Sequence, residues 1–209
     1  MIENLIYLII IVVFIIFGLP IIQRRMLIAK RISIINKLEK KHASRIITMI
    51  HRQEALSLFG FPIIKYIDIE DSERILRAIH LTDEDVPIEI IMHTPGGLVL
   101  ASEQIASALQ RHRARVTAYV PHYAMSGGTM IALTADEIIM DHDAVMGPID
   151  PQIGDPTRGS YPAASILAAL KKDNPNRSDN TLILGDIAEK AIRQTGEKTF
   201  NLLKNKMDE

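Results

Sequence analysis

Apolar and polar positions divide the chain into one long uncharged stretch and a series of shorter periodic segments. Residues 4–22 read NLIYLIIIVVFIIFGLPII and contain no charged side chain. About 20 apolar residues, rising 1.5 Å each in a helix, cross the roughly 30 Å hydrocarbon core of a membrane. We therefore predict a transmembrane anchor over residues 1–23. A cleaved signal peptide fits less well, because no basic residue precedes the run and no small-residue cleavage site follows it.

Basic residues directly after this run predict its orientation. Only Glu3 and the terminal amine precede the run, whereas the stalk at 24–43 is rich in lysine and arginine. By the positive-inside rule the N-terminus faces outward and everything after residue 23 stays in the cytoplasm. Apolar residues from Met26 to Leu38 are interleaved with these cations. The stalk is thus expected to continue the helix, to lie along anionic lipid headgroups, or to be solvated.

From residue 44 onward, short β-branched runs alternate with segments of helical periodicity. This alternation, with short connections, is typical of an α/β domain with a mainly parallel sheet. A Gly- and Pro-rich stretch at 147–162 predicts a mobile loop. Strands are predicted at 45–50, 64–69, 88–92, 116–120 and 138–140. Helices are predicted at 71–79, 99–112, 126–135, 163–172 and 182–203.

Composition narrows the classes of function. The 209-residue chain carries a net charge of -1 from 24 basic and 25 acidic residues, so no nucleic-acid partner is expected. It has no cysteine, which excludes disulfides, cysteine nucleophiles and thiolate metal sites. No feature of the sequence indicates a cofactor.

Two glycine turns carry the candidate chemistry, one at His93-Thr-Pro-Gly-Gly97 and one at Met125-Ser-Gly-Gly-Thr129. Each follows an apolar strand and opens a helix, so unpaired backbone N–H groups point outward at the positive end of a helix dipole. Glycine lets a substrate carbonyl approach this backbone, because no Cβ intervenes. Turns on neighbouring strands can direct the amides of Gly97 and Gly127 at one oxygen, forming an oxyanion hole beside the Ser126 hydroxyl.

Simpler interpretations of these turns exist. Serine is favoured as a helix N-cap, so Ser126 has a purely structural alternative. A phosphate-binding loop is an alternative for the glycines, but neither G-x-x-x-x-G-K nor G-x-G-x-x-G is present. On the residues alone, a capping serine and a nucleophile both remain open.

Histidines and further glycines near these turns are candidates for lining a substrate cleft. Gly96 and Gly128 belong to the turns, and His93 and His122 precede them at strand ends. With His142, three histidines follow separate strands, but no H-x-x-x-H or H-E-x-x-H pairing occurs. We therefore predict no metal site.

The stretches IIMHTPGG and VPHYAMSGGTMIALTADEIIMDHDAVMGPIDPQ resemble the serine dehydrogenase proteinase family, relatives of signal peptide peptidase A in the Clp-protease/crotonase superfamily. The similarity runs from about residue 45 to residue 193. It implies a ββα-spiral core, preceded here by one transmembrane helix, and a serine hydrolase domain over 44–209. It also implies Ser126 as nucleophile, Gly97 and Gly127 as oxyanion donors, and assembly into homo-oligomers.

The resemblance leaves the general base open. Relatives of the Clp type have a histidine near the position of Asp150-Pro151, where this chain has none. Relatives like signal peptide peptidase A use a downstream lysine, and Lys171, Lys172 and Lys190 are the candidates here, with Lys172 and then Lys190 favoured. A lysine base near neutrality needs a pKa roughly 3 below its usual value, which burial supplies. Lys172 follows Ser126 at a distance similar to that in the relatives, whereas apolar neighbours in the last helix are expected to bury Lys190.

The leading hypothesis is a membrane-anchored serine endopeptidase that cleaves peptides or membrane-protein remnants through an acyl-enzyme on Ser126. An extended substrate is expected to add as a strand to the edge of the cleft. One alternative is a crotonase-like acyl-CoA enzyme that uses Asp150 or Glu103. Another is a catalytically inactive, oligomeric membrane scaffold. Relatives usually continue past the last helix, so the domain is expected to be incomplete at its C-terminus, which favours the scaffold.

Overall fold

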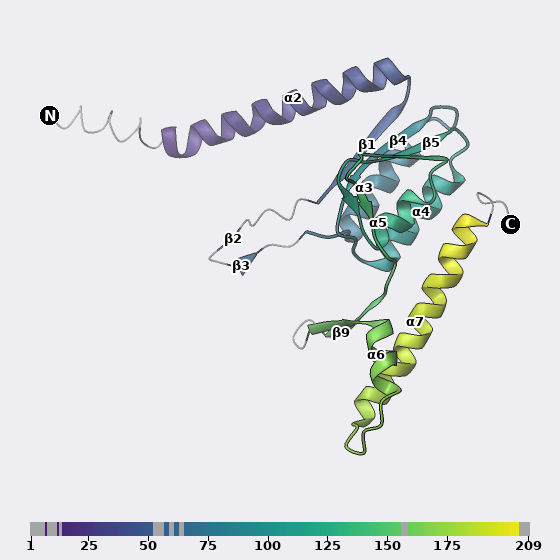
Figure 1. Cartoon of the computed structure of the whole chain (residues 1–209). Coiled ribbons are helices and arrows are strands. Elements are labelled where there is room, and N and C mark those ends of the chain that lie inside the picture. The colour runs from purple at the N-terminus through teal and green to yellow at the C-terminus, as the bar shows by residue number, and fades with distance from the viewer. Residues whose placement is uncertain are drawn as a thin grey trace. The chain divides into compact units, whose positions relative to one another are not determined.

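The structure is a computed structural model, and it divides into two compact units, Met1–Ile46 and Ile47–Glu209 (Figure 1). Within the described part of the chain, no helix is both long enough and apolar enough to cross a membrane. Residues 1–6, 8–11 and 13 of the predicted anchor lie outside the described residues. The described residues are 7, 12, 14–51, 57–58, 61–62, 65–155 and 159–204.

One long helix makes up most of the first unit. A π-helical turn, Phe14–Gly18, leads into α2, Leu19–His42, which carries a proline in its first turn. There the missing N–H of proline costs nothing, because helix ends leave such groups unpaired. The helix ends at Ala43, which adopts a left-handed φ of 51° and donates its N–H to the carbonyl of Glu39. No side chain of α2 is buried, so the predicted stalk is an exposed helix.

A four-stranded sheet organises the second unit. Along β4, Ile88, Ile90 and Met92 are fully buried, and the residues between them are half-buried. Such alternation places one face of the strand on the core, and it confirms the predicted α/β class with a parallel sheet. The strand order is β1 (Arg45–Ile50), β4 (Ile88–His93), β5 (Val116–Val120), β7 (Glu137–Met140), and the last three run parallel.

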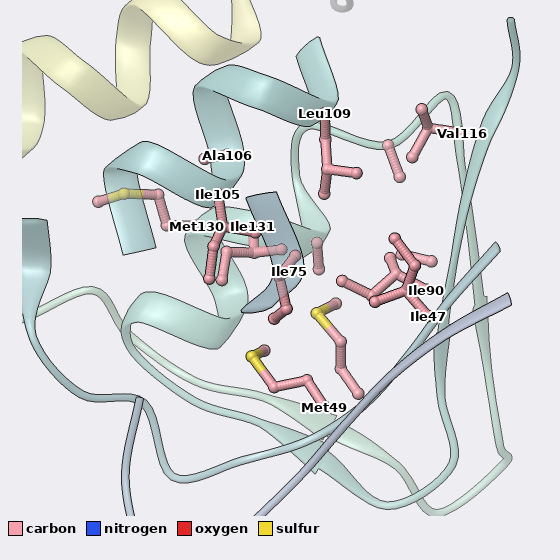
Figure 2. Packing of buried hydrophobic residues seen from close by; sticks show 14 of the residues in the cluster. Ile47, Met49, Ile75, Ile90, Ile105, Ala106, Leu109, Val116, Met130 and Ile131 are labelled. Atoms are coloured by element: carbon pink, nitrogen blue, oxygen red, sulfur yellow. The ribbon is translucent and has the colours of Figure 1, made fainter. Parts of the chain in front are cut away.

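Three helices cover the apolar face of this sheet: α3 (Ile69–His80), α4 (Val99–Arg111) and α5 (Gly127–Ala132). Figure 2 shows their side chains meeting those of the strands, with Ile105 of α4 close to Ile131 of α5. Both side chains are 0% exposed. Replacing a fully buried isoleucine by alanine typically costs about 2–5 kcal/mol, so this cluster holds the two glycine turns on a rigid base.

The strand predicted at 64–69 is wrong. The described part of this segment contributes a single bridge, between Ile67 and Gly97, and residue 64 lies outside the described residues. The reason is a capping box that starts α3 early. The Asp68 side chain accepts the N–H of Asp71, and the Asp71 side chain accepts the N–H of Asp68.

The loop predicted at 147–162 is also corrected, because it contains an antiparallel hairpin. Gly159, with a φ of 86°, begins the second strand in a conformation that favours glycine. The helix α5 ends at Ala132, earlier than expected, with Ala135 beyond it. The remaining elements are β2 (Ser57–Leu58), β3 (Phe61–Pro62), β6 (Tyr123–Ala124), β8 (Val145–Met146), β9 (Gln152–Asp155), β10 (Gly159–Pro162), α6 (Ala163–Leu170) and α7 (Asp179–Leu203).

The helices α6 and α7 pack against each other around a small hydrophobic cluster of their own. Its buried members are Ala163, Ile166 and Ala188. Near its C-terminal end, α7 also contributes Leu202 to the main cluster. The second unit therefore has one large core beneath the glycine turns and one small core between two helices.

Candidate active site

The chain beyond β4 and β5 brings the two glycine turns together. Thr94, directly after β4, forms a parallel bridge with Ala124 of β6. The Thr94 N–H donates to the carbonyl of Tyr123 at 3.1 Å, and the Met125 N–H donates to the carbonyl of Thr94 at 3.0 Å. The turn after Thr94 therefore runs beside the turn after Ala124.

The first turn requires glycine for both conformation and space. Gly96 has a φ of 98°, and a Cβ on it would stand 2.8 Å from the Cβ of Ser126. A Cβ on Gly97 would stand 2.2 Å from the carbonyl oxygen of Ile67. Ile67 also bonds both sides of this turn, since its N–H donates to Gly96 O and its carbonyl accepts the Leu98 N–H, each at 2.8 Å. The backbone of the first turn is thus held from outside by Ile67 and lies against Ser126.

Ser126 is held in a strained conformation at the second turn. Its φ of 50° and ψ of -115° lie outside the regions that non-glycine residues favour. Such strain costs on the order of 1–3 kcal/mol and is concentrated at functional sites. A nucleophile on a sharp strand-to-helix turn has this character.

The capping role of Ser126 that the sequence left open is not found. Ser126 occupies the N-cap position of α5, but its side chain makes no capping hydrogen bond. The residue is only partly buried, so the hydroxyl is not enclosed in the core. The serine therefore stands at a helix N-terminus without using its hydroxyl to stabilise the helix.

The amides of Gly97 and Gly127 belong to facing turns. A Cβ on Gly127 would stand 3.7 Å from the Gly97 nitrogen, and a Cβ on Gly96 would stand 3.2 Å from the Gly127 nitrogen. Within the described chain, neither amide N–H donates a hydrogen bond. The close approach of the two turns also requires glycine at position 128, because a Cβ there would stand 2.5 Å from Cγ2 of Thr94. The structure thus brings the predicted glycines together around Ser126.

This arrangement has the components of an oxyanion hole. Two amide donors lie near a hydroxyl, each from a turn at the N-terminal end of a helix, where the dipole adds partial positive charge. Donors of this kind stabilise a tetrahedral oxyanion by about 3–4 kcal/mol each. The catalytic roles of Ser126, Gly97 and Gly127 stay predictions, but their placement fits acyl transfer.

The lysines predicted as alternative bases are both exposed. Lys190 forms an ion pair with Asp186 at 2.6 Å, and its side chain is 58% exposed. The expectation that its apolar neighbours bury it is therefore not met. Lys172 follows α6 and lines a surface hollow with Asp173 and Arg177, and it too is exposed. Within the described residues, neither ammonium bonds the Ser126 hydroxyl, and the assignment of the base stays a prediction.

Three rings cluster where β4 and β5 lead into the turns. His93 stacks on His122 with ring centroids 5.3 Å apart, and Tyr123 lies 4.3 Å from the first ring and 5.1 Å from the second. His93 is half-buried and His122 is exposed. His142 stands apart, exposed and paired with Asp143 at 3.0 Å. Among the described residues, no group of three or more His, Asp or Glu side chains is arranged to hold a metal.

A cavity of about 660 Å³ lies beside α5 and is bordered by α7. Thr129 of α5 lines it, and its hydroxyl lies within hydrogen-bonding distance of two carbonyls, that of Ala124 at 2.7 Å and that of Gly147 at 2.8 Å. Asp150, one carboxylate of the crotonase-like alternative, also lines this cavity. The other, Glu103, forms an ion pair with Lys198 at 3.4 Å.

Several supporting residues were missed by the sequence interpretation. Ser102 is fully buried, and its Oγ would lie 2.1 Å from a Cβ on Gly127. Its burial could have been predicted, because Ser102 falls on the same helix face as Ile105 and Leu109, where a polar residue indicates a specific contact. His51, which bonds Thr94, had no comparable signal in the sequence.

The whole chain, residues 1–209, matches the family described as ClpP-like SDH-type serine proteinase. The chain belongs to the ClpP-like SDH-type serine proteinases. This confirms the family predicted from the two glycine turns.

Relatives of this chain include two uncharacterized proteins of Methanocaldococcus jannaschii. MJ1495 is 58% identical over 194 residues, and MJ0137 is 54% identical over 191 residues. These matches cover 93% and 91% of this chain but 65% of each relative, so the chain spans slightly less than two thirds of their length. Membrane protein NfeD1b of Bacillus subtilis is 28% identical over 124 residues, covering 58% of this chain and 28% of that protein.

Two solved structures of 1510-N membrane-bound stomatin-specific protease also resemble this chain. One is a serine-to-alanine mutant with 26% sequence identity and a TM-score of 0.42, covering 50% of this chain and 55% of that chain. The other is a lysine-to-alanine mutant in complex with a substrate peptide, with 27% identity and a TM-score of 0.42. It covers 50% of this chain and 52% of that chain.

Proposed function

We propose that this SDH-type proteinase is a membrane-anchored serine endopeptidase that hydrolyses peptide bonds through an acyl-enzyme on Ser126. The observation that carries the proposal is the strained Ser126, uncommitted to capping, between the amides of Gly97 and Gly127. Membership of the serine proteinase family agrees with it. A completed ββα spiral around this site is part of the same proposal.

In the proposed reaction, Ser126 Oγ attacks the scissile carbonyl and its proton passes to the base. The carbonyl oxygen becomes an oxyanion that accepts the N–H groups of Gly97 and Gly127. The C–N bond then breaks as the base returns the proton to the leaving amine. Water then attacks the ester carbonyl while the base accepts its proton. The C–O bond to Ser126 breaks as the base returns that proton to Oγ, which regenerates the hydroxyl. Lys172, and after it Lys190, is the proposed base, and either requires desolvation beyond what the single chain provides.

Apolar side chains beside the first turn support a peptide substrate. Leu98, Val99 and Leu100 follow the oxyanion glycine and are 45%, 42% and 60% exposed. Contiguous exposed apolar residues next to polar donors are characteristic of ligand sites. An extended peptide lying along this segment would place its carbonyl at the donors and its side chains on the leucines and valine.

A serine-directed fluorophosphonate tests the nucleophile. The full chain should be labelled at Ser126 with loss of fluoride, and Ser126→Ala should not be labelled. Ser160→Ala is the matched control, since Ser160 is exposed on the hairpin strand β10 and should leave labelling intact. Labelling of Ser126→Ala at the wild-type rate would refute the assignment.

The base is tested by the same reaction. Lys172→Ala should slow labelling by about 100-fold or more, as loss of a general base does. Lys190→Ala should leave the rate near wild type if Lys172 is the base, because Lys190 is paired with Asp186 on the surface. If neither substitution slows labelling, both lysines are excluded.

Membrane anchoring and a cytoplasmic site are also proposed. The uncharged run at 4–22 followed by cations supports them, and NfeD1b is described as a membrane protein. Because the chain has no cysteine, single engineered cysteines report topology without background. In intact cells, a membrane-impermeant maleimide should label Glu3→Cys but not Asp173→Cys. Labelling of Asp173→Cys in intact cells would show that the chain has the opposite orientation to the one proposed.

An inactive oligomeric scaffold is the second candidate. It is favoured by the Ser126 hydroxyl, which has no hydrogen bond to a base within the described residues. If the folded wild-type chain neither reacts with the fluorophosphonate nor cleaves peptides, the scaffold replaces the peptidase.

A further inference from the structure

A chain of polar contacts runs beneath the first glycine turn. The carboxylate of Asp71 lies 3.1 Å from Nε2 of His51, and Nδ1 of His51 lies 2.9 Å from Oγ1 of Thr94. Thr94 Oγ1 in turn accepts the N–H of Gly96 at 3.2 Å. Both central residues are inside the protein, with His51 6% exposed and Thr94 0% exposed. We name these four residues the turn relay.

Donors and acceptors along the turn relay match in one direction. Oγ1 of Thr94 accepts from Gly96, so its own O–H is available to donate to Nδ1 of His51. Nδ1 is then the acceptor of a neutral imidazole whose Nε2–H donates to Asp71. The other acceptor near the hydroxyl, Gly96 O, is farther away at 3.5 Å. Each buried polar group is satisfied in this arrangement.

The turn relay is anchored at both ends. Asp71 belongs to the capping box of α3, where it also accepts the Asp68 N–H at 3.2 Å. The backbone N–H of His51 donates to the carbonyl of His93 at 2.7 Å, which ties the end of β1 to the end of β4. The histidine ring is therefore fixed by its backbone and by a carboxylate that is itself fixed.

The turn relay holds the peptide unit directly before the one that supplies an oxyanion donor. The planar unit between Gly96 and Gly97 carries the carbonyl of the first and the N–H of the second. Its carbonyl accepts the Ile67 N–H at 2.8 Å, and the N–H of the preceding peptide unit is held by Thr94. Glycine has little conformational preference of its own, so these bonds set the direction of the Gly97 N–H.

We infer that Thr94, His51 and Asp71 are positioning residues that aim the Gly97 N–H at the oxyanion. The inference rests on the proposed function, because it concerns the hole beside Ser126. It assigns to a buried imidazole a role distinct from general base. His51 does not touch substrate; it orients the Thr94 hydroxyl that holds the turn.

The test compares three variants by rate and by amount of fluorophosphonate labelling. Thr94→Val has the same shape without the hydroxyl, and it should slow labelling by about tenfold or more while the final amount labelled stays the same. Thr94→Ser restores the hydroxyl and should recover most of that rate. Thr134→Val is the control: Thr134 is equally buried, but its hydroxyl bonds Ile131 O at the far end of α5. That variant should label at the wild-type rate.

A double substitution distinguishes a relay from separate effects. His51→Leu should slow labelling as Thr94→Val does, and the pair together should be no slower than the worse single variant. Multiplied losses would instead show that His51 and Thr94 act independently, which would overturn the relay.

Amide exchange of Gly96 tests the inference without any activity. Pro95-Gly96 is the single Pro-Gly pair of the sequence, so ¹³C-carbonyl proline with ¹⁵N-glycine isolates this amide by NMR. Exchange at Gly96 should accelerate at least about tenfold in Thr94→Val and His51→Leu, because its acceptor is lost or released. Unchanged exchange would refute the turn relay even if Ser126 is labelled. If wild type is not labelled, the peptidase proposal fails, and the Gly96 exchange still decides the relay.

Discussion

Replacing Gly127 by alanine tests how closely α4 supports the second glycine turn. A Cβ at this position would stand 2.1 Å from Oγ and 2.9 Å from Cβ of Ser102. Non-bonded atoms pack at about 3.5 Å or more, so the new methyl group falls roughly 1.4 Å short of an ordinary contact. Both helices are buried in the main cluster and cannot separate freely. We expect Gly127→Ala to lower the free energy of unfolding by about 3 kcal/mol, the upper end for overpacked sites.

Urea unfolding of the full chain, followed by circular dichroism, measures this loss of stability, and variants of Ser102 show whether the clash with Ser102 causes it. Ser102→Gly removes both clashing atoms and should cost about 1 kcal/mol, because glycine weakens a helix interior. In the double variant, the nearest atom to the new Cβ is the Gly97 nitrogen at 3.7 Å, an ordinary distance. The double variant should therefore be more stable than the sum of the single losses predicts, by about 2 kcal/mol.

A second alanine substitution serves as the control. A Cβ on Gly196, in α7, would meet no atom within 4 Å. Gly196→Ala should thus stabilise the protein by about 0.5–1 kcal/mol through helix propensity alone. Strict additivity of Gly127→Ala and Ser102→Gly would show that these residues do not meet, and the account of how α4 holds the second turn would be wrong.

Two further predictions concern strain and ionisation. Ser126→Gly should abolish labelling yet raise the free energy of unfolding by about 1 kcal/mol relative to Ser126→Ala, because glycine adopts a φ of 50° without strain; equal stability of the two variants in urea would contradict the strain. Burial, and then the carboxylates of Glu89 and Glu137, raise the pKa of the Tyr119 phenol above its ordinary value. The folded state therefore holds this proton longer than the unfolded state, so stability should be unaffected below about pH 10 and fall as pH rises through the folded pKa. Urea midpoints across alkaline pH should show this decline in wild type and a smaller one in Tyr119→Phe, and identical profiles would exclude the phenol as its source.

Most of the fold was predictable, because the apolar residues of its main strands and helices recur with a clear period. The β-branched runs at 88–92 and 116–120 are strands, and the apolar stripe of 99–112 is a helix, nearly as expected. The strand predicted at 64–69 does not form, because the capping box of two aspartates three positions apart outweighs the β propensity of the isoleucines around it. The hairpin inside 147–162 was missed because its strands are short and rich in Gly and Pro.

The parts of the candidate site that depend only on local sequence were predictable. A glycine pair after an apolar strand places backbone donors locally, so Gly97 and Gly127 needed no knowledge of the rest of the fold. The turn relay depends instead on contacts across the fold, since His51 and Thr94 meet only when β1 and β4 pair. Exposure of Lys190 likewise depends on which face of α7 is covered, which helical periodicity alone does not settle.

The packing of α6 on α7 is stabilised by a small cluster that is separate from the main cluster beneath the two glycine turns. Ala163, Ile166 and Ala188 share no cluster with the isoleucines beneath Ser126. A substitution there loosens the helical pair while the hydroxyl and its amides keep their spacing. The geometry of the glycine turns should therefore tolerate substitutions in this small cluster, whereas the placement of Lys172 and Lys190, the proposed bases on or beside these helices, should not.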